Sequence, residues 1–103
     1  MNKNENRKFE PFDIVKHFKR ETIDDPSSLL YYYKIVGDGF YTETNELVMI
    51  YEALYWPRQM YVRPYNMFMS EVNKEKYPDI KQKYRFEKVS GEELAEVIKK
   101  IGR

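Results

Sequence analysis

Five short stretches of the chain have the pattern of β-strands, by alternation of apolar and polar residues in the first and by runs of apolar and aromatic residues in others, which predicts a mainly β protein. The stretches are residues 13–19, 29–36, 47–56, 60–63 and 84–87. Aromatic and β-branched residues dominate the second and third stretches, as expected for central strands. The last stretch is predicted to be a closing strand that pairs with the first.

Turn-forming residues divide these stretches and predict how they connect. Gly37-Asp38-Gly39 ends the second stretch in a turn or bulge, after which residues 40–42 continue it. Thr44-Asn45-Glu46 supplies a tight reversal, so the second and third stretches are expected to form a long antiparallel hairpin. Pro64 follows residues 60–63 and lacks an N–H, which places this strand at a sheet edge or ends it there.

The connecting segments carry weaker patterns. Residues 21–28 combine acids, a proline and two serines, which is typical of a loop. Residues 65–72 lack alternation and are predicted to form a tight helical turn that inserts Met67 and Phe68 into the mouth of a barrel. Residues 73–84 are predicted to contain one further helical turn.

A short amphipathic helix is predicted at the C-terminal end of the sequence. Ser90 and Glu93 have the spacing of a capping box, in which the serine hydroxyl accepts a hydrogen bond from an orphan amide and the glutamate reaches back. Apolar residues then recur at the helical spacing i, i+3, i+4 and i+7. They are Leu94, Val97, Ile98 and Ile101. This stripe is expected to pack against the barrel.

Five short strands, irregular connections and one helix predict a small, partly open β-barrel. Closing a sheet removes exposed strand edges in a chain too short for a two-layer sandwich. We expect residues 1–8 to form a mobile N-terminal arm, 9–88 the barrel domain and 89–103 the C-terminal amphipathic helix.

The amino-acid composition excludes several classes of protein function. The 103 residues are 42% hydrophobic and 34% charged, which suits one soluble domain rather than a two-domain enzyme. The net charge of +1 provides no overall attraction to nucleic acid or to an anionic membrane. The sequence has no cysteine, which excludes disulfides, thiolate nucleophiles and cysteine-based metal sites. No stretch resembles a signal sequence or a membrane span, so we expect a cytoplasmic protein with no cofactor, metal or membrane partner.

Several segments together resemble a known family. They are DIVKHFK, YYKIVG, TNELVMIYEALY, YVRPYNMF and KYPDIKQKYRFE. Their order is similar to that of the bacterial domain of unknown function 1653 (DUF1653), over about residues 12–87. This resemblance implies an SH3-like barrel and no particular activity. In this chain Tyr61 replaces the tryptophan of many members, and the loop 21–28 and the helix after Glu87 are additions.

The parity of the strands gathers six polar or aromatic side chains on one face. We assign to the core Ile14, Phe18, Val48, Ile50, Leu54, Met60 and Val62. The side chains then predicted to face outward include His17, Lys19, Tyr51, Tyr55, Tyr61 and Arg63. Tyrosine and arginine often carry binding energy, and this set offers phenol rings for stacking, a guanidinium for a carboxylate or phosphate, and an imidazole. These six residues are the predicted ligand-binding surface.

Other interpretations stay open. In one, the tyrosines pack beneath the terminal helix or the N-terminal arm, and Arg63 pairs with Glu46 or Glu52. In a second, His17 and Arg63 serve a small-substrate enzyme or its accessory subunit, although no catalytic motif accompanies them. In a third, the segment 57–88, with eight basic and four acidic residues, binds single-stranded nucleic acid. We favour a non-enzymatic binding module for a protein or for a small anionic or planar ligand.

Overall fold

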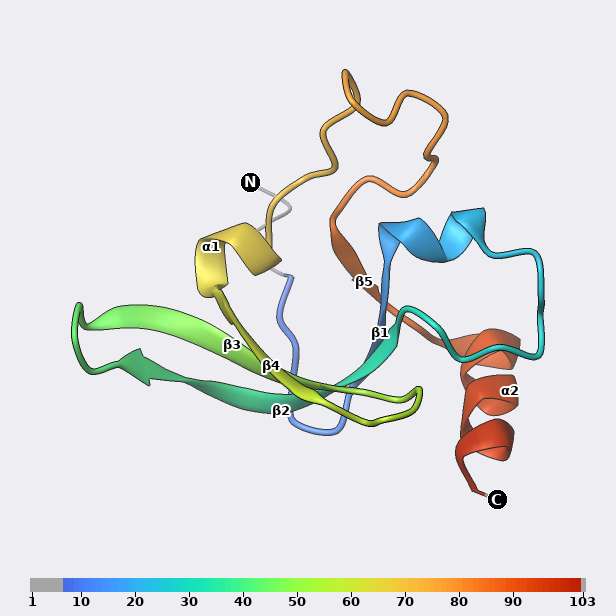
Figure 1. Ribbon diagram of the computed structural model, residues 1–103, viewed down its shortest axis with the longest axis horizontal. Helices are drawn as coiled ribbons and strands as arrows, with labels where there is room; N and C mark the ends of the chain where they lie inside the picture. Colours follow the sequence, from blue (N-terminus) through green and yellow to red (C-terminus); the bar gives the residue numbers. More distant parts are fainter. Residues whose placement is uncertain (1–6, 103) are drawn as a thin grey trace.

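One antiparallel sheet of five strands dominates the computed structural model, which describes residues 7–102 (Figure 1). Its strands are β1 (Ile14–His17), β2 (Tyr32–Tyr41), β3 (Glu46–Ala53), β4 (Met60–Pro64) and β5 (Phe86–Lys88). The helices are α1 (Tyr65–Phe68), α2 (Gly91–Ile101) and the 3-10 helix η2 (Phe18–Thr22). The strand order is β4-β3-β2-β1-β5, so the closing strand pairs with the first strand as predicted. The mainly β fold class is confirmed.

The β2–β3 hairpin is the longest part of the sheet, and it forms as predicted. Asn45 adopts a left-handed backbone (φ 59°), and its N–H donates to the carbonyl of Tyr41 at 2.6 Å. Asparagine tolerates this conformation better than most residues, which explains the tight reversal. Of the turn or bulge predicted at the glycines, the bulge is present: the register shifts between Ile35 and Gly37, and β2 continues to Tyr41.

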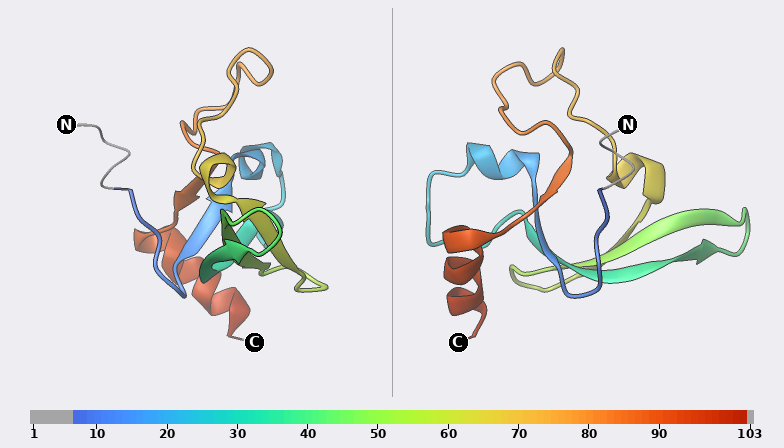
Figure 2. Two further views of the ribbon diagram at one scale, coloured as in Figure 1. Left: turned by 90° about the vertical axis from the view of Figure 1, so that its left-hand side faces the viewer. Right: turned by 180° about the vertical axis from the view of Figure 1, so that it is seen from behind.

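The sheet curls into a small, partly open barrel of the expected SH3-like kind. No pairing within residues 7–102 joins the edge strands β4 and β5 directly. The chain after α1 instead runs antiparallel to the chain before β5. The Val72 N–H donates to the Lys83 carbonyl, and the Arg85 N–H donates to the Ser70 carbonyl, each at 2.8 Å. Figure 2 shows the loop between α1 and β5 projecting beyond the sheet in two further views.

The first strand is shorter than predicted. β1 ends at His17, and residues 18–22 form the 3-10 helix η2 instead of completing the strand. His17 caps this helix, because its Nδ1 accepts a hydrogen bond from the Lys19 N–H at 3.1 Å. A side chain that accepts from a backbone amide two residues further on competes with strand pairing, which explains why the strand stops there.

The predicted grouping of side chains on β3 and β4 holds, but the face predicted to be open to solvent is buried as well. The inner face carries Met49, Tyr51 and Ala53 of β3, all of them buried. Met60 and Val62, which were assigned to the core, are 59% and 63% exposed. A period of two residues determines which side chains lie together, but not which side of a curved sheet is concave.

Two hydrophobic clusters cover opposite faces of the sheet. The inner cluster contains Val15, Tyr33, Ile35, Met49, Tyr51, Ala53, Phe68 and Phe86. The outer cluster, under α2, contains Ile14, Tyr32, Leu54, Val89 and Val97. Of the predicted core residues, those that are buried are Ile14, Phe18, Val48 and Leu54, whereas Ile50 is only partly buried. Ile14 and Val15 point to opposite faces of β1, and both are buried. This strand therefore lacks a face that is open to solvent, and alternation in the sequence cannot distinguish its two faces.

Helix α2 packs on the outer face without the predicted capping box. Ser90 precedes the helix, and its side chain makes no capping hydrogen bond. The Glu93 carboxylate instead accepts from Lys16 Nζ at 3.0 Å and from the Tyr32 hydroxyl at 2.7 Å. The left-handed backbone of Gly91 (φ 63°) departs from the geometry that a capping box needs. Within the described part of the chain, no helix combines the length and the apolar composition needed to span a bilayer.

Two side chains predicted to be buried are exposed because each is next to the residue that takes the core position. Met67 is 47% exposed and Ile98 is 53% exposed. Their neighbours Phe68 and Val97 are 0% and 1% exposed. Consecutive residues of a helix point roughly 100° apart, and here one of each pair faces the core while the other is turned to the surface.

The N-terminal segment is anchored where the described residues begin. The Arg7 guanidinium donates to the carbonyl of Met69 at 3.1 Å and to that of Phe86. Residue 7 therefore contacts the barrel, in contrast to the mobile arm expected for residues 1–8. Residues 1–6 lie outside the described part of the chain.

Ser90→Ala is expected to lower the free energy of unfolding by less than about 0.5 kcal/mol, whereas a serine that caps through its side chain usually contributes about 0.5–2 kcal/mol. The reason is that the Ser90 hydroxyl makes no hydrogen bond to the helix. Urea denaturation of the two proteins measures the difference. A loss of more than about 1 kcal/mol would mean that the capping box forms in solution.

Candidate functional site

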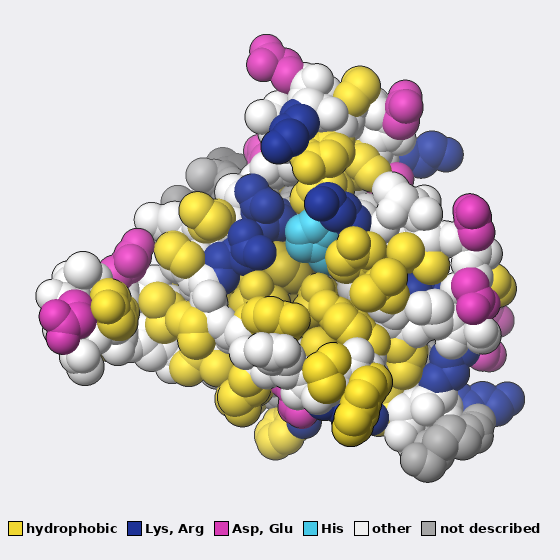
Figure 3. Space-filling view, in the orientation of Figure 1, with side chains coloured by type: hydrophobic (Ala, Val, Ile, Leu, Met, Phe, Trp, Pro, Cys, Tyr) yellow, Lys and Arg dark blue, Asp and Glu magenta, His cyan; other side chains and the backbone are white. Residues whose placement is uncertain are grey.

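A pocket of about 320 Å³ lies at the end of β1, beneath the loop that connects α1 to β5. It is lined by His17, Phe18, Lys19, Arg63, Asn73, Lys76, Tyr77 and Arg85, and we call it the cationic pocket. Figure 3 shows Lys and Arg side chains gathered around the cyan ring of the single histidine, with acidic side chains at the margins of this face.

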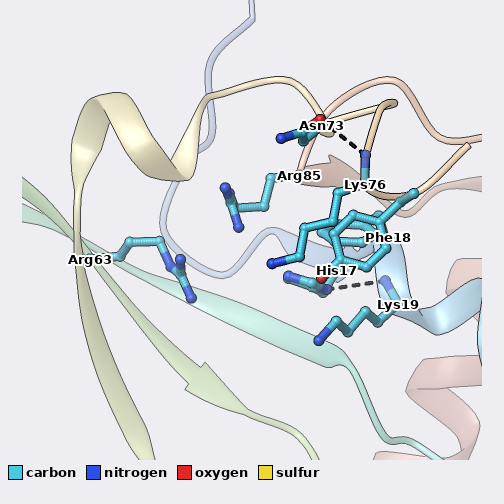
Figure 4. A pocket seen from close by; sticks show the side chains of 8 residues that line it. His17, Phe18, Lys19, Arg63, Asn73, Lys76 and Arg85 are labelled. Carbon is cyan, nitrogen blue, oxygen red and sulfur yellow. Dashed lines mark hydrogen bonds between the residues drawn. The ribbon is translucent and has the colours of Figure 1, made fainter. Parts of the chain in front are cut away.

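The cationic pocket concentrates positive charge that no carboxylate balances. Four of its eight lining side chains are cationic and none is acidic. The ion pairs found within residues 7–102 involve none of these four cations. The cationic side chains come from η2, β4, the loop and the residue before β5, and Figure 4 shows them extending into one space around His17. Like charges held together cost free energy, so packing alone does not explain this cluster.

The two arginines are each held through Nε, and no hydrogen bond within residues 7–102 uses the outer nitrogen atoms of either guanidinium. Arg63 Nε donates to the Tyr51 hydroxyl at 3.1 Å, and Arg85 Nε donates to the Ser70 hydroxyl at 3.2 Å. Burial, and after it the charge of Arg63, lowers the pKa of Arg85. A guanidinium fixed in this way presents a planar fork that suits the oxygen atoms of an anion.

His17 contributes a neutral imidazole to the cationic pocket. It is 9% exposed, and its ring packs edge-on against Phe86 with the ring centroids 5.1 Å apart. Burial, followed by the charges of Arg85, Arg63 and Lys19, lowers the pKa of His17 to about 4. Because Nδ1 accepts the Lys19 N–H, the neutral ring carries its proton on Nε2. No hydrogen bond within the described residues uses that Nε2–H donor.

The loop over the pocket is fixed by hydrogen bonds at its base. Lys74 Nζ donates to the carbonyl of Gln82 at 3.0 Å and to that of Ile80. The Tyr77 ring packs against Phe18, with the ring centroids 4.8 Å apart. These contacts hold the lining residues of the loop over the pocket, with an aromatic wall on one side.

Half of the predicted ligand-binding residues line the cationic pocket. They are His17, Lys19 and Arg63, which the fold brings together from β1, η2 and β4. Arg63 forms no ion pair within residues 7–102, so the structural pairing with Glu46 or Glu52 does not occur. No ion pair in the described part of the chain involves any of these three residues.

The three predicted tyrosines belong to the inner face but do not line the pocket. Tyr51 is 4% exposed and supports Arg63 from below through its hydroxyl. The Tyr61 ring packs against Tyr51, with the ring centroids 5.7 Å apart. The Tyr55 hydroxyl is hydrogen-bonded to that of Tyr33 at 2.8 Å. Tyr51 and Tyr55 are therefore held by contacts within the inner face rather than beneath the terminal helix, while Tyr61 is 36% exposed.

Five lining residues were not among the predicted ligand-binding residues, for two different reasons. They are Phe18, Asn73, Lys76, Tyr77 and Arg85. Phe18 was assigned to the core, and it is buried while one side of its ring borders the pocket. The other four belong to the basic and aromatic segment 57–88, which was considered as a separate nucleic-acid surface. The run of cations in this segment was the one sequence feature that pointed to these residues. Nothing in the sequence indicated that the segment lies next to His17.

Comparison with known proteins identifies one family. The family model described as "Protein of unknown function (DUF1653)" matches residues 13–88. The matched region contains all five strands of the sheet and all the lining residues of the cationic pocket. No curated protein and no solved structure matches the chain.

Proposed function

Because the chain belongs to the DUF1653 family, whose function is unknown, we propose a function from the cationic pocket itself. The domain is a small binding module, and the pocket takes a small anionic ligand. The supporting observation is that four cationic side chains converge on one pocket with no acidic partner. A bound anion relieves their mutual repulsion and accepts their hydrogen bonds.

The aromatic wall of the pocket allows the ligand to carry a planar group. The Tyr77 ring is partly exposed at the mouth and is packed against Phe18. Lys19 Nζ and Lys76 Nζ lie 5.9 and 5.7 Å from the centroid of the same ring. An aromatic ring flanked by cations suits a flat anionic molecule better than a bulky aliphatic one.

An enzyme at this site would need one of these residues to act as a general base. A general base must face the substrate with an unprotonated atom. The Nδ1 atom of His17 already accepts the Lys19 N–H, and Nε2 carries the proton. None of the lining side chains is a carboxylate that could orient this imidazole. The arrangement therefore favours binding over catalysis.

Nucleic-acid binding receives less support than a single anion pocket. The cations of the segment 57–88 make separate contacts within the protein and do not form one continuous basic surface. Lys74 donates to carbonyls inside the loop, and Lys88 pairs with Asp13 at 3.4 Å. A strand of nucleic acid needs a continuous groove of cations and stacking rings.

Lys76→Gln is expected to weaken the binding of small anions by about three- to tenfold, because it removes one of the four converging charges. The measurement is the rise in melting temperature with added sulfate, phosphate or citrate at constant ionic strength. A ligand that binds only the folded state stabilises it by RT ln(1 + L/Kd), where L is the free ligand concentration, so the dependence of this temperature on anion concentration reports the affinity.

Lys83→Gln is the matched control. Lys83 is also an exposed lysine of the same loop, and its Nζ lies 5.4 Å from the ring of the next tyrosine, as Lys76 Nζ does at 5.7 Å. It does not line the pocket. Equal weakening by both variants would indicate general attraction to the loop, and no response of the wild type to any of the three anions would refute the proposed function.

A further inference from the structure

The donors of the cationic pocket approach it from several directions, which distinguishes between kinds of anion. Lys19, Arg63 and Arg85 come from η2, β4 and the residue before β5. Lys76 adds a charge from the loop above. A carboxylate is planar and is satisfied by the two parallel hydrogen bonds of a single guanidinium. A phosphoryl group has three strong acceptor oxygens and up to two negative charges, so it can use donors that are not coplanar.

The histidine adds a donor of another type. His17 is about nine-tenths buried, and its Nε2–H has no hydrogen-bond partner within residues 7–102. Every fully buried side-chain nitrogen or oxygen in that range has a partner, so Nε2 must reach the pocket space. This donor therefore opens onto the pocket, where a ligand that enters can accept its hydrogen bond.

We propose that the cationic pocket binds the dianionic phosphoryl group of inorganic phosphate or of a small phosphate monoester. The guanidinium groups of Arg63 and Arg85 hold two of its oxygen atoms, and the Nε2–H of His17 donates to the third. Lys19 and Lys76 add further positive charge around the group. This inference rests on the proposed function and narrows its ligand to one class.

The size of the pocket restricts what the phosphoryl group can carry. Its volume of about 320 Å³ is near the lower end of the roughly 300–1,000 Å³ typical of small-molecule sites. A small ester fits this space, with its organic part beside the aromatic wall of Phe18 and Tyr77.

Calorimetric titrations of the full chain with methyl phosphate and sulfate, each at pH 5.0 and 7.5, test the charge requirement. A phosphate monoester has a second pKa of roughly 6, so about a tenth of it is dianionic at pH 5.0 and nearly all of it at pH 7.5. Sulfate is a dianion at both pH values. Any change in sulfate affinity between the two pH values therefore comes from titration of the protein. We expect methyl phosphate to gain about tenfold in affinity relative to sulfate at the higher pH.

Inorganic phosphate and acetate at pH 7.5 complete the series. Whichever of inorganic phosphate and methyl phosphate binds more tightly identifies the source of the phosphoryl group. Acetate is expected to bind at least tenfold more weakly than either. If acetate binds as tightly as methyl phosphate, or if the ratio of methyl phosphate to sulfate affinity is unchanged with pH, the phosphoryl assignment is wrong while the anion pocket stands. If none of these anions binds, both proposals fail.

Arg63→Lys tests the contribution of the guanidinium fork. It keeps the charge and removes the planar pair of donors, so we expect methyl phosphate affinity to fall at least tenfold. Circular dichroism of the variant confirms that it is folded. A folded Arg63→Lys protein with unchanged affinity would overturn the geometry proposed for the phosphoryl group.

Discussion

Replacing Phe86 with alanine is expected to lower the free energy of unfolding by about 3–5 kcal/mol, a large part of the stability of a small domain. Phe86 is 1% exposed and stacks on Phe68 with the ring centroids 4.0 Å apart and the planes within 6°. Its ring also contacts those of Tyr33, Tyr51 and His17. The substitution therefore leaves a cavity at the centre of the inner cluster. Equilibrium unfolding in urea measures the loss.

Phe40→Ala provides the same chemical change at a surface position. Phe40 lies on β2 and is 64% exposed, so its truncation is expected to change the free energy of unfolding by no more than about 0.5 kcal/mol. Phe86→Leu keeps most of the buried volume, and a loss of less than about 1.5 kcal/mol is expected. If Phe86→Ala costs no more than Phe40→Ala, the stacked pair does not form the core.

The second large effect is a loss of stability on acidification that depends on His17. Burial, followed by the charges of Arg85, Arg63 and Lys19, lowers the pKa of His17 in the folded protein to about 4, from 6.5. As the pH falls below 6.5, His17 becomes protonated in the unfolded chain but stays neutral in the folded chain. The contribution of His17 is therefore fully present above pH 6.5 and is lost down to about pH 4, by about 3 kcal/mol in all.

His17→Gln isolates this contribution from that of the carboxylates, which also titrate at low pH. Glutamine cannot take up the proton but retains an amide oxygen to accept and an N–H to donate. We expect the stability of the wild type to fall more steeply than that of the variant between pH 6.5 and 4. Urea unfolding at a series of pH values gives the two curves, and parallel curves would mean that the His17 pKa is close to its ordinary value.

The candidate site was predictable in part, because the residue types were informative while their placement was not. The parity of β3 and β4 correctly grouped Tyr51, Tyr61 and Arg63 on one face. It did not show that both faces of β3 are covered, because apolar residues occupy both faces of this strand. Met60 and Val62 look like core residues in the sequence, and yet they face solvent on the edge strand.

The capping box predicted at Ser90 does not form, and the reason is again a long-range contact. A glutamate three residues after a serine satisfies the local pattern of a capping box. The same Glu93 carboxylate is within reach of Lys16 and Tyr32, which lie 77 and 61 residues away in the chain. A charged amine and a phenol are stronger competitors for a carboxylate than a backbone amide is. No local motif contains that information.

The sequence by itself determined the number of strands, the hairpin, the pairing of the closing strand and the family, because these depend on local periodicity, turn chemistry and segment order. Only the tertiary structure decided that Arg85 and Lys76 stand beside His17, Lys19 and Arg63. These residues are brought together by the curvature of the sheet and by a loop whose path depends on long-range hydrogen bonds. Contacts of that kind are made between segments distant in the chain, so no spacing within any one segment records them.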